Sequence, residues 1–312
     1  MIAHWDDVER VRLEKGPLAS WVRDLGDAAG TKRVGVTRWE IDPGKRSTPV
    51  HMEGDEEEIY FVLAGSGLAY QWDGEEARTH EIRAGDCIVQ RVEEEAHTLV
   101  AGPDGLDVLA FGERTHLAGT WLPRAGVVRM GPTIDVSTGP HPWEREVAAG
   151  ELELPEPSPR PKNIVNVDDL EGDYEGRWKR PAREAGAERT GLSWGKLYAG
   201  EEGADPHVHS AEEEIYVVLE GSGLLELWPS PMLESRGVER ERHELRAGHV
   251  VSRPAGTGIA HHIRAGDAGI TYLAYGERNP NDIVYYPRSG KTYFRGIGLL
   301  TKLEPVLPEE DD

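Results

Sequence analysis

The sequence predicts an all-β fold made of two tandem barrels, and two observations lead to this expectation. The first is an internal repeat, because "VHMEGDEEEIYFVLAGSG" at 50–67 is echoed 156 residues later by "PHVHSAEEEIYVVLEGSG" at 206–223. The second is that both copies consist of short runs rich in Val, Ile and Tyr, separated by clusters of Gly, Asp and Pro. Such runs and turns are typical of β-sandwiches and β-barrels.

The repeat extends over most of the chain, which indicates a tandem duplication. "HEIRAGD" at 80–86 matches "HELRAGH" at 243–249, and "LAFGER" at 109–114 matches "LAYGER" at 273–278. The separation between matching residues drifts only from 156 to 164, as short loop insertions would produce. Each copy is therefore expected to form one barrel.

The segment between the copies differs in composition. "GPHPWEREVAAGELELPEPSPRPKN" at 139–163 is rich in Pro and Glu and lacks clear periodicity, which favours a linker. The closing "LPEEDD" is typical of a solvated acidic tail. The predicted organisation is an N-terminal domain at 1–131, a linker at 132–163, a C-terminal domain at 164–298 and an acidic tail at 299–312.

Composition limits the classes of partner. The 312 residues include 38% hydrophobic residues and carry a net charge of −22, which suits a globular protein with a sizeable core. A surface this acidic repels phosphate backbones and anionic lipid, so we expect neither nucleic acid nor membrane as a partner. The sequence has no long apolar run and no signal pattern, and its one cysteine, Cys87, excludes an internal disulfide. These features predict a cytoplasmic protein.

The second copy carries a set of side chains suited to a metal ion. His207 and His209 alternate with Val208, so both imidazoles project from the same face of a strand. Glu214 follows a predicted turn that would direct it to that face, and His261 follows a distant Gly-rich loop. Three imidazoles and one carboxylate can hold a divalent Fe, Mn, Ni, Co, Cu or Zn ion and leave positions open for water or substrate.

These residues resemble the two motifs of the cupin superfamily. The first, G-x5-HxH-x3-4-E-x6-G, is matched from its HxH onward by "HVHSAEEEIYVVLEG". The second, G-x5-PxG-x2-H-x3-N, is matched by "GHVVSRPAGTGIAHHIRAG", with two extra loop residues and without the final Asn. The resemblance covers both copies and implies a bicupin, similar to functionally uncharacterised bacterial cupins, with two double-stranded β-helix (jelly-roll) barrels. It also implies that His207, His209, Glu214 and His261 are metal ligands.

The first copy has an altered version of the same set: His51, Glu53, Glu58 and His97, with Glu53 at the position of His209. Two histidines and two carboxylates would neutralise a divalent ion and favour harder ions such as Mn or Fe. The alternative is that Glu53 turns outward and this barrel binds no metal.

For several neighbouring residues the sequence favours a surface or packing role over a role in metal binding. Glu212 and Glu213 are expected to be solvated turn charges, and His80 and His243 to lie at the surface. His262 should face away from its neighbour His261, because adjacent residues in a strand alternate. Tyr60 and Tyr216 should point into their barrels, either as pocket residues or as filling.

The resemblance leaves the activity open, since cupins include dioxygenases, decarboxylases, isomerases, lyases and binding proteins. We expect a metal-dependent enzyme, dioxygenase-like, that acts on a small oxygen-bearing organic molecule at the C-terminal barrel. The alternative is a non-catalytic small-molecule-binding or sensing cupin. Oxalate decarboxylase activity is disfavoured, because those bicupins carry an Arg just before HxH, where this chain has "GADP". No catalytic residue is assigned, and the expected assembly is a monomer or homodimer.

Overall fold

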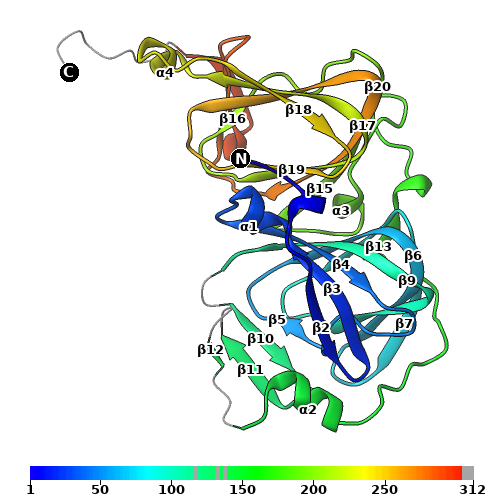
Figure 1. Ribbon diagram of the computed structural model, residues 1–312. Helices are drawn as coiled ribbons and strands as arrows, with labels where there is room; N and C mark the ends of the chain where they lie inside the picture. Colours follow the sequence, from blue (N-terminus) through cyan, green and yellow to red (C-terminus); the bar gives the residue numbers. More distant parts are fainter. Residues whose placement is uncertain (116–117, 131–133, 136–138, 304–312) are drawn as a thin grey trace.

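The computed structural model describes residues 1–312 except 116–117, 131–133, 136–138 and 304–312. It consists of two β-barrels, one above the other in Figure 1, and confirms the predicted all-β class. Most of the predicted acidic tail at 299–312 lies outside the described residues. Within the described ranges, no helix combines the length and apolar character needed to cross a bilayer.

The N-terminal barrel is built from two sheets. The larger sheet has the order β13-β8-β6-β9-β4-β3-β2, with β7 paired to β6, and the smaller has the order β12-β11-β10-β5. The strands that the first copy contributes are β2 (Val11–Lys15), β3 (Leu18–Asp24), β4 (Val34–Ile41), β5 (Met52–Glu53), β6 (Glu58–Trp72), β7 (Ala77–Arg83), β8 (Asp86–Gln90), β9 (Ala96–Glu113), β10 (Gly119–Leu122), β11 (Val127–Met130) and β12 (Ile134–Asp135).

The C-terminal barrel repeats this plan. Its larger sheet has the order β1-β19-β17-β20-β15-β14, with β18 paired to β17, and its smaller sheet has the order β16-β21-β22-β23. The strands that the second copy contributes are β14 (Trp178–Lys179), β15 (Thr190–Leu197), β16 (Val208–His209), β17 (Glu214–Pro229), β18 (Glu241–Arg246), β19 (His249–Arg253), β20 (Ile259–Glu277), β21 (Ile283–Tyr286), β22 (Lys291–Phe294) and β23 (Leu299–Lys302). The short helices are α1 (Leu25–Ala29), α2 (Pro142–Ala148), α3 (Pro181–Glu184) and α4 (Pro231–Ser235), and the 3-10 turns are η1 (Trp5–Asp7), η2 (Val167–Asp169) and η3 (Arg295–Ile297).

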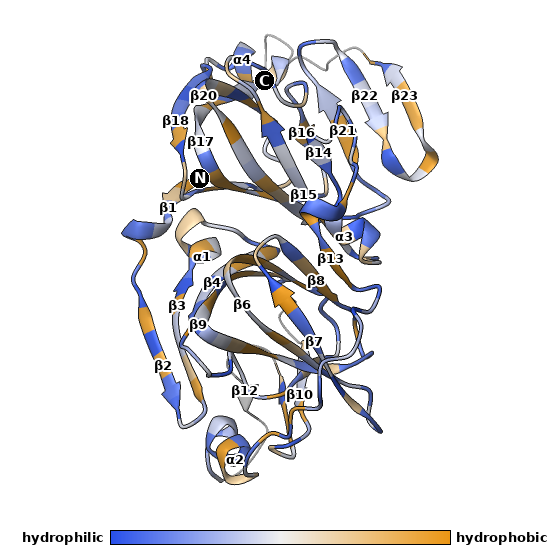
Figure 2. Cartoon of the chain, turned by 90° about the vertical axis from the view of Figure 1, so that its right-hand side faces the viewer, coloured by the Kyte–Doolittle hydropathy of each residue, from blue (hydrophilic) through white to orange (hydrophobic). Residues whose placement is uncertain are grey.

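Alternation along the strands creates two kinds of core. In β17, Ile215 and Val217 belong to a cluster between the barrels, whereas Tyr216 and Val218 belong to the interior of the C-terminal barrel. Side chains at successive strand positions project to opposite faces, so one strand serves both cores. Apolar and hydrophilic segments accordingly alternate along the strands of both barrels (Figure 2).

Each copy gives its first strand to the other barrel. β1 (Ile2–His4) pairs antiparallel with β19 of the C-terminal barrel, and the chain's N-terminus lies beside that barrel in Figure 1. β13 (Ile164–Asn166) begins the second copy and pairs antiparallel with β8 of the N-terminal barrel. Each larger sheet is therefore completed by a strand from the other half of the chain. Whether the predicted domain limits bound independently folding units stays a prediction.

Two buried glutamates connect the barrels reciprocally. The Glu213 carboxylate accepts hydrogen bonds from the backbone N–H groups of residues 32–34 at 2.6–3.3 Å. The Glu57 carboxylate accepts hydrogen bonds from the backbone N–H groups of residues 188–190 at 2.7–3.4 Å. The exposed fractions are 0% for Glu213 and 1% for Glu57, so the expectation that Glu213 is a solvated turn charge is wrong. Its negative charge is satisfied by amides of the opposite barrel.

The segment predicted as a linker contains α2, which lies against the N-terminal barrel at the end away from the C-terminal barrel (Figure 1). The fully buried Glu146 of α2 forms ion pairs with Arg46 at 2.7 Å and Arg124 at 2.9 Å. Further along this segment, the carbonyl of Ser158 accepts a hydrogen bond from His80 at 3.2 Å. His80 is therefore buried, and its expected surface position is wrong.

Replacing Glu213 with Gln should destabilise the protein by about 2 kcal/mol, because a neutral amide is a weaker acceptor for three backbone donors. Chemical denaturation followed by circular dichroism measures this change. Glu220→Gln, at an exposed position of β17, the strand that follows Glu213, is the matched control and should shift stability by less than about 0.5 kcal/mol. Equal stability of the Glu213 and Glu220 variants would contradict the proposed role of the carboxylate.

Candidate metal centre

The structure brings together the four side chains predicted as ligands in the second copy: His207, His209, Glu214 and His261, here called the C-terminal donor group. His207 precedes β16 and forms an antiparallel bridge with His261 of β20, His209 ends β16, and Glu214 begins β17. The distance to Oε2 of Glu214 is 3.6 Å from Nε2 of His207, 3.5 Å from Nε2 of His209 and 2.9 Å from Nε2 of His261. Three imidazole nitrogens thus converge on one carboxylate oxygen.

Hydrogen bonds on the far side of two rings fix their orientation. Nδ1 of His207 donates to the carbonyl of Asp205 at 2.8 Å, and Nδ1 of His209 donates to Oδ2 of Asp282 at 2.6 Å. A proton on Nδ1 leaves Nε2 as the atom with a free lone pair when the ring is neutral, which is the form that binds metal.

One buried atom in this group lacks a partner. Nε2 of His209 is buried without any hydrogen-bond partner. Buried polar atoms are nearly always satisfied, so an unpaired imidazole nitrogen aimed at a carboxylate and two other imidazoles fits the position of a metal ligand. The residues present are therefore compatible with a divalent transition metal ion.

The electrostatics of the group favour the protonation states that metal binding needs. Burial would raise the pKa of Glu214, but the neighbouring histidines outweigh burial and hold the pKa of this carboxyl well below its usual value. Burial, followed by the charge of His207, lowers the pKa of His261 to about 3. Glu214 is thus ionised and His261 is neutral at physiological pH.

Sequence reasoning missed Asp282 and misplaced Glu212. The side chain of Asp282 is fully buried, and besides His209 it accepts the backbone N–H of Ala211 at 2.9 Å. Glu212 is 2% exposed, forms an ion pair with Arg295 and accepts the backbone N–H of Asn279 at 2.6 Å. The expectation that Glu212 is a solvated turn charge is therefore wrong. Both carboxylates form a layer behind His209.

The repeat itself contains a signal for Asp282. At the local separation of 164 residues, Asp282 corresponds to Ala118, and Glu53 corresponds to His209 at the separation of 156. The second copy thus has both His209 and Asp282, and the first copy has neither a histidine nor an aspartate at the matching positions. The comparison of the copies therefore identifies Asp282 as a position where the second copy has a carboxylate that the first copy lacks.

The tyrosine two residues after each inward glutamate lies in the site. The Tyr216 hydroxyl donates to Oε2 of Glu214 at 3.1 Å and lies 2.9 Å from Nε2 of His261. Tyr60 makes the same contacts in the first copy, at 3.1 Å from Glu58 and 3.4 Å from His97. Both tyrosines therefore point inward, as expected.

His262, by contrast, lies outside the site. Its Nδ1 donates to the carbonyl of Ala204 at 2.8 Å, and its Nε2 lies 3.6 Å from Glu202. This agrees with the predicted alternation.

The first copy forms a related but looser arrangement of His51, Glu53, Glu58 and His97, here called the N-terminal donor group. Oε2 of Glu58 lies 3.3 Å from Nε2 of His51 and 3.0 Å from Nε2 of His97. Oε1 of Glu53 is farther away, 3.8 Å from Nε2 of His51, while its Oε2 accepts the hydroxyl of Thr120 at 2.8 Å. The Glu53 side chain is only 12% exposed, so it does not turn out to solvent.

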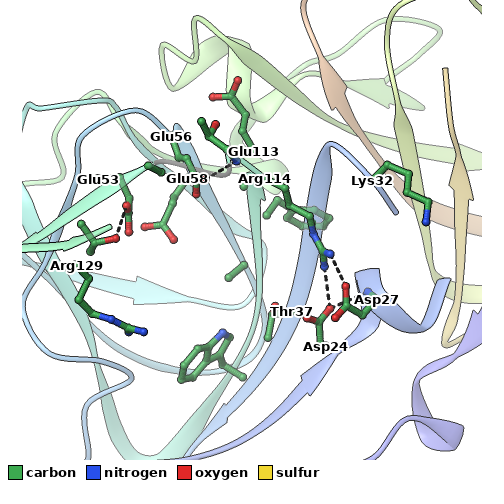
Figure 3. A pocket seen from close by; sticks show the side chains of 18 residues that line it. Asp24, Asp27, Lys32, Thr37, Glu53, Glu56, Glu58, Glu113, Arg114 and Arg129 are labelled. Carbon is green, nitrogen blue, oxygen red and sulfur yellow. Dashed lines mark hydrogen bonds and ion pairs between the residues drawn. The ribbon is translucent and has the colours of Figure 1, made fainter. Parts of the chain in front are cut away.

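A cavity of about 590 Å³ opens onto the N-terminal donor group. Figure 3 shows Glu53, Glu56 and Glu58 at one end of the cavity, and Arg114 paired with two aspartates at the other. Burial, followed by the charge of Glu58, raises the pKa of Glu53 to about 7. This part of the barrel is therefore rich in carboxylates that a cation would stabilise.

Asp282→Asn should weaken divalent metal binding at the C-terminal donor group by roughly 10- to 100-fold, because outer carboxylates orient and polarise ligand histidines. Competition with a chromophoric chelator for Zn²⁺ or Mn²⁺ measures the affinity. Asp267→Asn, at an exposed position within β20, should leave it unchanged. Identical affinities of wild type and Asp282→Asn would refute the proposed role.

The sequence matches no family model and no curated protein. Solved structures nevertheless match over nearly the whole chain. Lactobacillus farciminis oxalate decarboxylase in a formate complex matches with a TM-score of 0.61 and 16% identity, over 91% of this chain and 88% of that one. Bacillus subtilis oxalate decarboxylase at pH 4.6 matches with a TM-score of 0.60 and 14% identity, over 88% of this chain and 75% of that one. At these identities the likeness establishes the fold alone: two double-stranded β-helix barrels in one polypeptide.

Proposed function

We propose that this bicupin is a metal-dependent enzyme that acts on a small oxygen-bearing organic molecule at the C-terminal barrel, with dioxygenase-type chemistry as the leading subclass. The observation that carries the proposal is the buried, unpartnered Nε2 of His209, which faces Glu214 together with the Nε2 atoms of two other histidines. Three imidazoles and one carboxylate leave coordination positions open on an octahedral ion such as Mn, as a catalytic site requires.

The proposed cofactor is a divalent transition ion. The donor set suits Fe, Mn, Ni, Co, Cu or Zn, and the Mn(II) centres of the fold neighbour Bacillus subtilis oxalate decarboxylase support including Mn among the first ions tested. When bound, the ion would supply Lewis acidity or one-electron chemistry beside the substrate.

The surrounding side chains would have distinct roles. The C-terminal donor group would hold the ion, and Asp282 would keep the Nδ1 proton on His209. The Tyr216 hydroxyl, within hydrogen-bond distance of Glu214 and His261, is placed to donate a hydrogen bond beside the reacting molecule. The three histidines and Tyr216 are at most 9% exposed, and burial of this kind strengthens each of these interactions.

We also propose a second, more anionic metal site at His51, Glu53, Glu58 and His97. Two carboxylates would neutralise a divalent ion, so this site would be a weaker Lewis acid and would favour hard ions such as Mn. The Glu53 side chain is 12% exposed and lies 3.8 Å from Nε2 of His51, which supports a ligand role over an outward rotamer.

The activity of the fold neighbours is not part of this proposal. Oxalate decarboxylation is named for them at no more than 16% identity, and here Gly203–Pro206 precede His207, with no arginine among them. A binding or sensing role without turnover is the competing function, and a turnover assay separates the two. We place the protein in the cytoplasm as a monomer or homodimer with a small-molecule partner.

His207→Ala should lower the metal content by about one ion per chain, because the ion needs all four donors and is not retained when one of them is removed. Elemental analysis after reconstitution with Mn²⁺ or Fe²⁺ measures the stoichiometry. His51→Ala should remove the second ion, and His243→Ala, at a partly exposed position on β18, should remove none. Unchanged stoichiometry in His207→Ala would rule out the ligand assignment.

The metal-loaded protein should consume oxygen with at least one member of a panel of catechols, diketones and 2-oxo acids. His207→Ala should lower that rate at least roughly 100-fold, since the chemistry depends on the bound ion. An oxygen electrode with product analysis makes the measurement. Tight binding of a panel member without any turnover would favour the sensing role.

A further inference from the structure

The metal proposal leaves unexplained a buried arginine inside the C-terminal barrel. Arg253 ends β19, is 8% exposed, and pairs across the ladder with Glu214 of β17. The next pair on that face is Val251 with Tyr216, and both belong to the barrel interior. Opposite residues of an antiparallel pair project to the same face, so the side chain of Arg253 lies inside the barrel together with Glu214.

The guanidinium of Arg253 is poorly satisfied. Its Nη2 donates to the carbonyl of Ile259 at 3.0 Å, whereas its Nε is buried and has no partner. In the part of the chain that the structure describes, Arg253 forms no ion pair. A buried guanidinium that is not in ion-pair contact with a described carboxylate is costly, which indicates that an anion outside the protein's own side chains completes the site.

The arginine lies close to the C-terminal donor group. The carbonyl that it contacts belongs to Ile259, two residues before His261 on the same strand. Arg253 is also the ladder partner of Glu214, which belongs to that group. Guanidinium and donor group therefore face one interior space.

The first barrel differs at this position. Gln90 pairs across the ladder with Glu58 and accepts a hydrogen bond from Gln71 at 3.2 Å. With a divalent ion and neutral histidines, the N-terminal donor group has no net charge, because Glu53 and Glu58 cancel the ion. The C-terminal group has one carboxylate and the added charge of Arg253. The C-terminal donor group, with Arg253 beside it, is therefore better suited to an anionic ligand than the N-terminal donor group.

We propose that Arg253 determines specificity by binding a carboxylate of the substrate, so that the substrate of the C-terminal barrel is a small organic acid. The proposal rests on the proposed function of the same site. The planar guanidinium presents parallel N–H donors that match a carboxylate, and a charge-assisted pair in a buried site is strong. The Glu214 side chain remains 21% exposed, so a small molecule can reach this end of the barrel.

The test compares the full-length protein with Arg253→Gln, which introduces the residue that the N-terminal barrel itself carries. The protein is loaded with Zn²⁺, and acetate and its neutral isostere acetamide are titrated by saturation-transfer NMR. Arg253→Gln should weaken acetate binding at least roughly tenfold and leave acetamide unchanged, because only the carboxylate loses a charged partner. Arg253→Lys should keep part of the acetate affinity, and Arg242→Gln, whose side chain is 74% exposed on β18, should keep all of it.

The outcomes separate this proposal from the metal proposal. Acetate binding that is equal in wild type and Arg253→Gln, at equal zinc content, overturns the role of Arg253. A zinc content near zero overturns the metal proposal alone, since the same titration of metal-free protein still decides whether acetate depends on Arg253. If Arg253→Gln does not fold, Arg253→Met provides the same comparison with an apolar chain of similar length.

Discussion

The architecture depends on two carboxylates buried between the barrels. Glu57 and Glu213 each accept backbone amides from the opposite copy, and each immediately precedes the inward glutamate of its own barrel. Neighbouring strand residues project to opposite faces, so fixing Glu213 at the interface also fixes Glu214 toward the barrel interior. Contact between the barrels and geometry of the candidate metal groups are thus set by one strand register. A shift of that register by one residue would exchange the two faces of the strand, and both the contact between the barrels and the geometry of the donor group would be lost.

The two barrels share a scaffold but differ in chemistry. The second has a histidine supported by Asp282 and a buried arginine beside Glu214. The first has Glu53 held by Thr120 and a neutral pair of glutamines at the arginine position. Glu53 in place of His209 makes the first site more anionic, and Arg253 in place of Gln90 makes the second more cationic, whereas Asp282 adds a carboxylate behind His209. Duplication thus supplied two copies of one geometry, and a few substitutions gave them different electrostatic character.

Much of this could be predicted from the sequence, since the repeat, the strand-like runs and the spacing of His207, His209, Glu214 and His261 are local patterns. The errors concern residues whose environment comes from elsewhere in the chain. Glu212 and Glu213 lie in an acidic run that resembles a solvated turn, yet one is buried by Arg295 and Asn279, and the other by amides of the first copy. Non-local burial of this kind leaves no periodicity in the sequence.

Other residues could be placed only by pairing information. Asp282 is 73 positions from His209, and the inward direction of Arg253 follows from its ladder partner. His80 precedes a turn, which suggests exposure, but the segment around Ser158 covers it.

The exchange of β1 and β13 has a consequence for the history and connectivity of the chain. In a single copy, the first strand would not pair with its own barrel. The edge of β8 in the first copy, or of β19 in the second, would then have no partner strand. Open edges recruit further strands, so a one-copy ancestor would complete its sheets only by swapping first strands with a twin. In the present chain the covalent connection between copies makes that partnership permanent, independent of concentration, and leaves each half free to diverge.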